Sequence, residues 1–244
     1  MARRTLTPAT RAVLDEYFAR LSRHYGPTGW WPGDTPFEIA VGAILTQNTA
    51  WRNVELAIEN LKRDKLLAPR AILECSTSRL ESALRPSGYF RVKARRLRSF
   101  CRHLADEYGG SMARMARRPL GALRVELLGV HGIGPETADD ILLYACGRPV
   151  FVVDAYTRRI LSRHGHTAAD ISYEELRSVF EGTLPADPVM FKEYHGLIVH
   201  AGKDFCRSRP RCEGCPLAAT LKPGQPILPH AREAGRPLRR PGRR

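Results

Sequence analysis

The sequence predicts an all-α protein, and three observations carry that prediction. A serine or threonine followed three residues later by glutamate, the pattern of a helix capping box, occurs at Thr35, Ser78 and Ser172. Apolar residues recur at helical spacing beyond such starts, as in the stripe of Leu97, Phe100, Cys101 and Leu104. No run alternates apolar and polar residues as a half-buried strand does. The short β-branched run at 150–153 is therefore expected to be an extended connection.

The elements follow in order from these signals. The helix that begins at Pro36 is apolar on every side from Ile39 to Leu45, so it is expected to be central. Gln47-Asn48-Thr49 interrupts it, and helical spacing resumes at Val54, Ala57, Ile58 and Leu61. Residues 223–244 hold five prolines, six arginines and almost no apolar periodicity, and they are expected to form a disordered basic tail.

The charge of the chain indicates an anionic partner. Its 244 residues carry a formal net charge of +14, of which the tail contributes +5 and residues 1–222 the remaining +9. Nucleic acid is the expected partner of so basic a protein. No stretch approaches the ~18 apolar residues of a membrane span. Met1 to Arg4 precede an amphipathic helix rather than a signal peptide, so we expect a cytoplasmic protein with no membrane partner.

Residues 128–138 contain a short glycine-rich turn between two helical patterns. Gly132 and Gly134 let the backbone turn tightly around Ile133, so the N–H groups that start the next helix can meet a phosphate with no side chain in the way. A plain turn between helices, in which glycine serves only the backbone, is the alternative.

Asp154 stands between an apolar run and a helical pattern from Ala155 to Arg163. A carboxylate in that place can be partly desolvated and rigidly held, as a catalytic carboxylate must be. It can also be the N-cap of the helix, since aspartate is among the best N-cap residues. The two roles are compatible, because capping N–H groups keep a carboxylate ionised.

Four features occur in a fixed order: Leu45-Thr46-Gln47-Asn48-Thr49, Ser87-Gly88-Tyr89 with basic residues after it, the hairpin with Val152-Val153-Asp154, and three clustered cysteines. Together they resemble the endonuclease III branch of the helix-hairpin-helix, Gly/Pro-Asp (HhH-GPD) superfamily of DNA glycosylases, over about residues 30–217. The resemblance implies a two-lobed fold, with a six-helix barrel lobe and its hairpin at 28–148. The N- and C-terminal helices, at 1–27 and 149–222, would form the other lobe and carry a cysteine loop. Double-stranded DNA would lie between the lobes, with a damaged nucleotide flipped into a pocket there.

The resemblance also assigns catalytic roles. Asp154 matches the family's catalytic aspartate, whose carboxylate stabilises the positive charge that develops on the sugar. Glu136, the second catalytic candidate, occupies the position of the lysine with which bifunctional members attack the sugar. A carboxylate cannot form a Schiff base, so the resemblance implies a monofunctional glycosylase with water as nucleophile. Alternatively, Glu136 is only an acid that the helix dipole favours in a first turn, by ~0.3–1 kcal/mol.

Trp30, Trp31 and Pro32 precede the central helix. Paired tryptophans are often core residues. Two neighbours in an irregular segment are not expected both to point inward, however, and a flipped base needs flat faces on which to stack. The arrangement is similar to that in the family's 3-methyladenine glycosylases, which also lack the lysine. Their substrates carry positive charge on the base, which favours cation–π stacking, so an alkylated purine is the expected lesion.

Gln47 matches the family residue that fills the gap left by a flipped base, although alone it would be interpreted as a polar residue at a helix end. Six cations occupy twelve residues after Tyr89: Arg91, Lys93, Arg95, Arg96, Arg98 and Arg102. Such a run is usually a solvated face. With the hairpin in the same lobe, Arg91 and Lys93 are expected to contact phosphate.

Cys206, Cys212 and Cys215 resemble the family's loop of four cysteines around a [4Fe–4S] cluster, although the first gap is one residue shorter than in endonuclease III. The fourth cysteine is missing, because the expected position is Leu221 and no cysteine follows. Three thiolates can hold a cluster if another ligand fills the fourth site, and a [4Fe–4S] cluster is the prediction. A Cys3His zinc site completed by His230 and a loop without metal are the alternatives.

These features together predict a monomeric base-excision repair enzyme that hydrolyses the N-glycosidic bond of a flipped, damaged base. Two other functions stay open. The first is an endonuclease III-type glycosylase and AP lyase that acts on oxidised pyrimidines. The second is a non-catalytic DNA-binding protein that keeps only the hairpin.

Overall fold

The computed structural model describes residues 8–221, and every regular element in that range is helical. The prediction of an all-α fold is confirmed, and residues 150–153 form the expected extended connection, which is buried. None of the helices described is both long enough and apolar enough to cross a membrane. The basic tail predicted at 223–244, which includes His230, lies outside the described residues.

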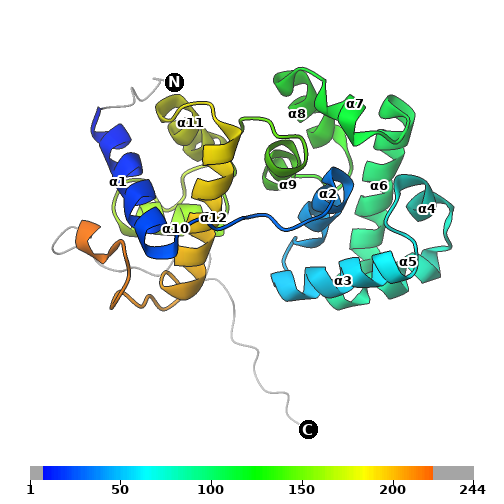
Figure 1. Ribbon diagram of the computed structural model, residues 1–244, viewed down its shortest axis with the longest axis horizontal. Coiled ribbons are helices and arrows are strands. Elements are labelled where there is room, and N and C mark those ends of the chain that lie inside the picture. The colour runs from blue at the N-terminus through cyan, green and yellow to red at the C-terminus, as the bar shows by residue number, and fades with distance from the viewer. Residues whose placement is uncertain (1–7, 222–244) are drawn as a thin grey trace, which may run out of the picture. The chain divides into compact units, whose positions relative to one another are not determined.

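Contacts between residues divide the described chain into two compact units (Figure 1). The first unit contains residues 8–28, 153–185 and 193–221, and the second contains residues 29–152 and 186–192. The chain passes from the first unit to the second after Thr28. It returns to the first unit just before Asp154, so the candidate catalytic residue and the hairpin belong to different units.

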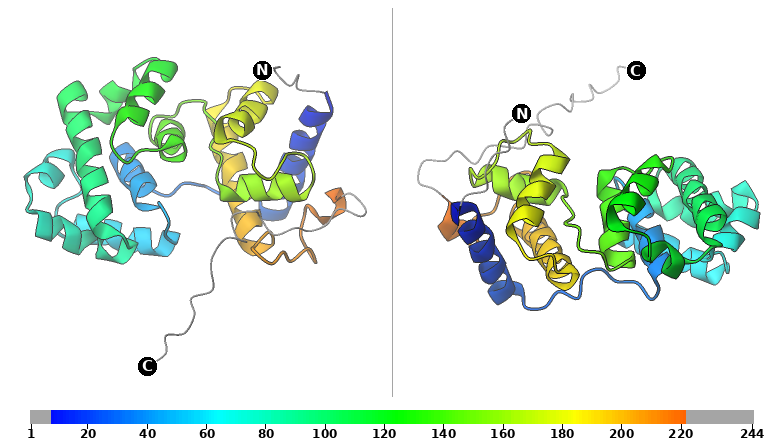
Figure 2. Two further views of the ribbon diagram at one scale, coloured as in Figure 1. Left: turned by 180° about the vertical axis from the view of Figure 1, so that it is seen from behind. Right: turned by 90° about the horizontal axis from the view of Figure 1, so that it is seen from above.

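Helix α2 (Pro36–Leu45) is the centre of the second unit. Figure 2 shows other helices packed around it. Its neighbours are α3 (Trp51–Arg63), α6 (Phe90–Tyr108), α9 (Pro135–Asp140) and the π-helical segment η2 (Ile141–Ala145). A helix that is apolar on every side needs neighbours on every side, because each exposed Å² of apolar surface costs about 25 cal/mol. The prediction of a central helix here is confirmed.

Shorter helices complete the second unit: α4 (Pro69–Glu74), α5 (Thr77–Leu84), the 3-10 helix η1 (Arg85–Ser87), α7 (Met112–Ala116) and α8 (Leu120–Gly129). Helices α4 and α5 pack against α6, and α8 packs against α9. Arg124 of α8 pairs with the buried Asp139 of α9 through two contacts, Nε to Oδ1 at 2.7 Å and Nη2 to Oδ2 at 3.0 Å. This two-point pair fixes the two helices that flank the hairpin.

The first unit contains α1 (Pro8–Tyr25), α10 (Ala155–Arg163), α11 (Tyr173–Thr183), most of α12 (Pro188–Asp204) and the 3-10 helix η3 (Ala218–Thr220). Tyr194 of α12 is buried, and its hydroxyl donates to the backbone oxygen of Leu14 in α1 at 2.8 Å. Its ring meets Phe18 and Phe180 edge-on, at centroid distances of 5.2 and 5.7 Å. This one side chain therefore joins α1, α11 and α12.

Two of the three predicted helix starts lie where the capping pattern places them. Ser172 and Glu175 form a complete capping box at α11, and Thr35 accepts the backbone N–H of Glu38 at α2. The start predicted at Ser78 is wrong. Helix α5 begins two residues earlier, because Ser76 follows α4 in extended backbone and caps the helix by accepting the N–H of Arg79.

Lys93 of α6 is a buried structural residue. It is 1% exposed, and its Nζ donates to the backbone oxygen of Ser87 at 2.6 Å. Burial, with a smaller effect from the nearby positive charge of Arg96, lowers the pKa of Lys93 to about 8. The prediction that Lys93 contacts phosphate is therefore wrong. Helical spacing places it on the face that also buries Leu97 and Phe100.

Lys93 gives the stability of the protein a pH dependence above neutrality. The folded state binds this proton only below a pKa of about 8, whereas the unfolded state keeps it to about pH 10.4. Between those values the unfolded state binds more protons, so the contribution of Lys93 to the free energy of unfolding rises with pH. We compare the free energy of unfolding of the wild type with that of Lys93→Met by urea denaturation. As the pH rises from about 7.5 to 9.5, the free energy of unfolding of the wild type should increase relative to that of the variant.

Arg91, an exposed residue of the same helix, supplies a control for this measurement. Arg91→Met removes a cation from the same helix, but its side chain is 75% exposed. Its free energy of unfolding should keep the same pH profile as the wild type. A Lys93→Met profile parallel to that of the wild type would contradict the assignment.

Candidate functional site

The two carboxylate oxygens of Asp154 have different partners. Oδ1 caps α10, accepting the backbone N–H of Thr157 at 2.7 Å and the hydroxyl of the same residue at 2.8 Å. Oδ2 lies 3.7 Å from Nε2 of His195 in α12, an electrostatic contact too long for a hydrogen bond. The Asp154 side chain is 12% exposed. It is therefore rigidly held and largely desolvated, with a small part open to solvent.

These contacts keep Asp154 ionised. Burial by itself raises the pKa of this carboxyl group, but His195 and the two Thr157 donors favour the carboxylate and outweigh burial. The pKa of Asp154 is therefore below the usual value for aspartate. Its contribution to stability is present above about pH 4 and is lost as the pH falls through the lowered pKa.

Sequence reasoning did not identify the two partners of this carboxylate. Thr157 stands three residues after the aspartate, where the N-cap rule places a donor, so local spacing could have found it. His195 is 3% exposed and reaches Asp154 from a distant part of the chain. A histidine within a helix such as α12, which also contains His200, carries no local signal, so only the tertiary structure identifies it.

The hairpin lies between α8 and α9 in the second unit. Ile133 is 5% exposed and anchors it. Gly132 has φ +87°, and a Cβ there would lie 2.1 Å from Cγ of Arg96, so both backbone and packing require glycine. Gly134 has φ −93° and open space where a Cβ would stand. None of the described residues packs against the place of a side chain at 134, so a binding partner such as a phosphate group could approach the backbone there.

Gln47 is held against the hairpin by both ends of its side-chain amide. Its Nε2 donates to the backbone oxygen of Gly132 at 3.0 Å and to the hydroxyl of Thr137 at 2.9 Å. Its Oε1 accepts a hydrogen bond from Nη1 of Arg96. The gap-filling role predicted for Gln47 requires these bonds to exchange for bonds to DNA.

Glu136 is the second residue of α9, behind Pro135, and it is exposed. An acid in the first turn of a helix is favoured by the helix dipole. Glu136 thus follows the N-cap residue Gly134 by two positions in the chain, at the place where the resemblance implies a lysine in bifunctional enzymes.

Trp30 and Trp31 belong to an aromatic cluster of four rings in the second unit. Trp31 meets Trp51 edge-on at 5.0 Å and lies 5.0 Å from Tyr144, while Trp30 lies 6.3 Å from Trp51. Both tryptophans of the pair are half-buried, and Pro32 is exposed. The two rings therefore share Trp51 as a common partner. Sequence reasoning missed Trp51 and Tyr144, which come from α3 and η2.

The cations of α6 have separate roles. Arg91 is exposed, with its guanidinium 5.7 Å from the centroid of the Phe90 ring. Arg98 donates to the backbone oxygen of Cys75 at 2.6 Å, while Arg96 donates to Gln47 and packs against Gly132 of the hairpin. Only part of the predicted run is thus exposed, so Arg91 remains a candidate for phosphate contact and Lys93 does not.

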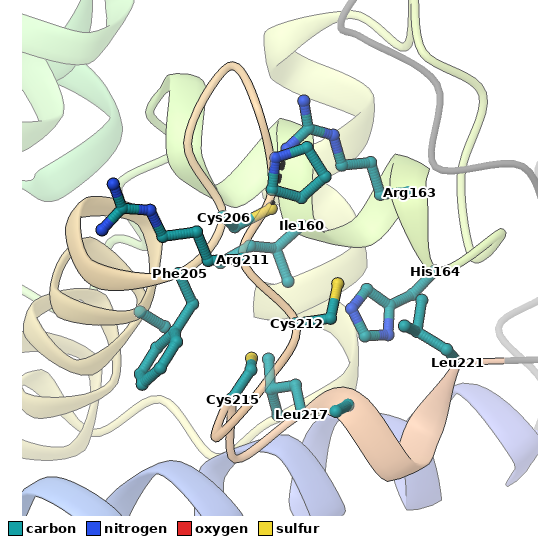
Figure 3. Close-up of a pocket in the computed structure, with 13 residues that line it drawn as sticks. Ile160, Arg163, His164, Phe205, Cys206, Arg211, Cys212, Cys215, Leu217 and Leu221 are labelled. Atoms are coloured by element: carbon teal, nitrogen blue, oxygen red, sulfur yellow. Dashed lines mark hydrogen bonds between the residues drawn. The ribbon is translucent and has the colours of Figure 1, made fainter.

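The three clustered cysteines line one pocket of the first unit (Figure 3). The pocket holds about 430 Å³ of space, including its open part. Arg163 donates from Nη1 to Sγ of Cys206 at 3.3 Å. Burial raises the pKa values of Cys206 and Cys215, while Arg163 opposes this at Cys206 and the N–H groups of Leu217 and Ala218 oppose it at Cys215.

Two of the three sulfurs have donors that favour the thiolate form, although burial has the larger effect on both pKa values. N–H donors directed at sulfur are typical of iron–sulfur sites, where they tune the cluster. Among residues 8–221, no three histidine, cysteine or acidic side chains converge as the ligands of a single ion do. His164 also lines the pocket, and burial, aided by the nearby His166, lowers its pKa to about 4, so its ring is neutral at neutral pH.

The chain is similar to known DNA repair proteins over most of its length. Residues 41–186 match the family described as HhH-GPD superfamily base excision DNA repair protein. The chain is 46% identical over 207 residues to a protein of Methanocaldococcus jannaschii assigned as a DNA repair glycosylase. The aligned residues cover 84% of this chain and 94% of that relative.

Solved structures are also similar. One is the 3-methyladenine DNA glycosylase MagIII of H. pylori bound to 1,N6-ethenoadenine, with a TM-score of 0.67 and 28% identity, covering 80% of this chain and 97% of that one. Another is a trapped endonuclease III–DNA covalent intermediate, with a TM-score of 0.75 and 22% identity, covering 87% and 95%. The second likeness shows the fold alone.

Proposed function

The chain belongs to the HhH-GPD superfamily of base excision DNA repair proteins, and we propose that it is a monofunctional DNA glycosylase that removes an alkylated purine from duplex DNA. The observation that carries this proposal is the carboxylate of Asp154, which is desolvated, rigidly held and ionised. These are the properties that stabilisation of a cationic sugar requires.

Asp154 would act by charge. As the bond between sugar and base breaks, positive charge grows on the sugar, and a fixed carboxylate lowers the energy of that state. Oδ1 is occupied by the cap of α10, so Oδ2 is the oxygen proposed to face the sugar or to orient the attacking water. Because the anion is built into the helix start, little reorganisation accompanies the reaction.

Water, rather than an amine, is the proposed nucleophile. Glu136 stands where the bifunctional enzymes carry their lysine, and a carboxylate cannot form a Schiff base with the sugar. The product would then be an intact strand with an abasic site.

The alkylated purine is proposed from the aromatic cluster and from the chemistry of the leaving group. A purine alkylated at N3 or N7 carries positive charge, which stacks favourably on tryptophan and weakens the glycosidic bond. Such a base leaves without a general acid, so one carboxylate suffices. The similarity to MagIII, whose structure contains 1,N6-ethenoadenine, supports a modified purine.

We further propose that Cys206, Cys212 and Cys215 hold a [4Fe–4S] cluster. The three cysteines line one pocket, and hydrogen-bond donors that favour a thiolate reach the sulfurs of Cys206 and Cys215. When bound, the cluster would supply a redox-active crosslink within the loop at 206–215. Arg163 would place its positive charge beside Cys206.

Replacement of Asp154 by asparagine separates charge from capping. Asparagine caps helices about as well as aspartate, so Asp154→Asn should fold normally but lose the anion. We expect its rate of base release to fall by at least about 100-fold. The measurement is single-turnover release of bases from methylated duplex DNA, with the products identified by chromatography.

The exposed Asp170 provides the matched control. Asp170→Asn removes the same charge from an exposed side chain that is not part of the helix cap of Asp154, and it should leave the rate unchanged. If Asp154→Asn releases bases as fast as the wild type, or if the wild type releases no base from any damaged DNA, a non-catalytic DNA-binding role prevails.

Borohydride trapping tests the nucleophile. The wild type should form no covalent complex with DNA that contains an abasic site, because it presents no amine to the sugar. Glu136→Lys should gain a trapped complex, visible as a shifted band on a denaturing gel. A trapped complex with the wild type would overturn the monofunctional assignment and favour a lyase.

A further inference from the structure

We propose that His164 is the fourth ligand of the iron–sulfur cluster, in place of the missing cysteine. This inference rests on the cluster proposed above and names the residue that completes it. It is carried by the residues that surround the three sulfurs.

The pocket offers one further side chain with an iron-binding atom. Its described lining consists of the three cysteines, His164, two arginines and apolar residues. Arginine is always protonated and binds no iron, and Leu221, at the expected position of the fourth cysteine, has no donor atom. His164 is 6% exposed, and its ring points into the pocket beside Cys212 (Figure 3).

Hydrogen bonding leaves the second ring nitrogen of His164 for a metal. Its Nδ1 lies 3.0 Å from Oγ1 of Thr220, and that hydroxyl also has two acceptors for its single proton, the backbone oxygen of Leu217 at 2.8 Å and the hydroxyl of Tyr17 at 3.3 Å. When Thr220 gives its proton to either of these acceptors, Nδ1 is the donor to Thr220 and Nε2 carries the lone pair. A metal-bound histidine is usually oriented in this way, with its other nitrogen donating to a fixed acceptor.

The spacing of the sulfurs favours a cluster over a single zinc ion. Zinc draws its ligands to about 2.3 Å, so its thiolates must converge on one point. In Figure 3 the sulfurs of Cys206, Cys212 and Cys215 are spread around the pocket, and no such convergence occurs within residues 8–221. A [4Fe–4S] cluster binds each ligand through a different iron, which accommodates this wider arrangement.

A histidine ligand would change the cluster in a measurable way. The neutral imidazole replaces a thiolate anion, so the reduced cluster carries less negative charge and the reduction potential is higher. One iron also becomes distinct from the other three.

Iron analysis and Mössbauer spectroscopy of the full-length protein test this inference. The chain is produced with ⁵⁷Fe, purified without oxygen, and analysed for iron and acid-labile sulfide. We expect about four irons per chain and a spectrum in which about one iron in four is distinct. His164→Cys should give four similar irons, and His164→Ala should lose the distinct iron or change its signal.

His166 is the control, because it stacks on His164 at 6.4 Å but does not line the pocket. His166→Gln should keep the wild-type spectrum. If His164→Ala fails to fold, His164→Cys decides alone, since it inserts a thiolate at the same place. A wild-type spectrum in both His164 variants would overturn the ligand assignment.

Iron content separates failure of the ligand from failure of the cluster. A wild-type protein without iron, or with one zinc per chain, overturns the cluster and His164 with it. The glycosylase proposal is judged separately, by the dependence of base release on Asp154.

Discussion

The carboxylate of Asp154 joins the fold to the proposed chemistry. One oxygen starts α10 by accepting two donors from Thr157, and the other meets His195 of α12. The same contacts that hold the helix start therefore keep the charge that a cationic sugar needs. A residue that only capped the helix would not need a histidine at its second oxygen, and a freely rotating carboxylate would lose its position during the reaction.

A second set of contacts organises the hairpin. Gly132 allows the turn and gives room to Arg96, while Gln47 bonds to Gly132, Thr137 and Arg96 together. Gly134 has no such internal reason for lacking a side chain. The hairpin is thus rigid where it meets the protein and bare at one backbone position, which suits a contact with a phosphate group.

Sequence patterns predicted the helices and caps that depend on neighbouring residues. They missed the contacts that form between distant parts of the chain. The central helix, the cap at Ser172 and the cap at Asp154 follow from local spacing. Lys93 was misassigned because charge was given more weight than helical spacing, which places it on the buried face of α6. His195, Trp51 and Tyr144 reach their partners from remote segments, so no local pattern could identify them.

The most direct test of this account is the ionisation of Asp154 itself. Carboxyl carbons can be labelled with ¹³C in aspartate, and the Asp154 resonance can be assigned by its absence from Asp154→Asn. We predict that its chemical shift stays at the ionised value from about pH 8 to about pH 4.5, because the pKa lies below the usual value of about 3.9. A shift that moves toward the protonated value within that interval would contradict it.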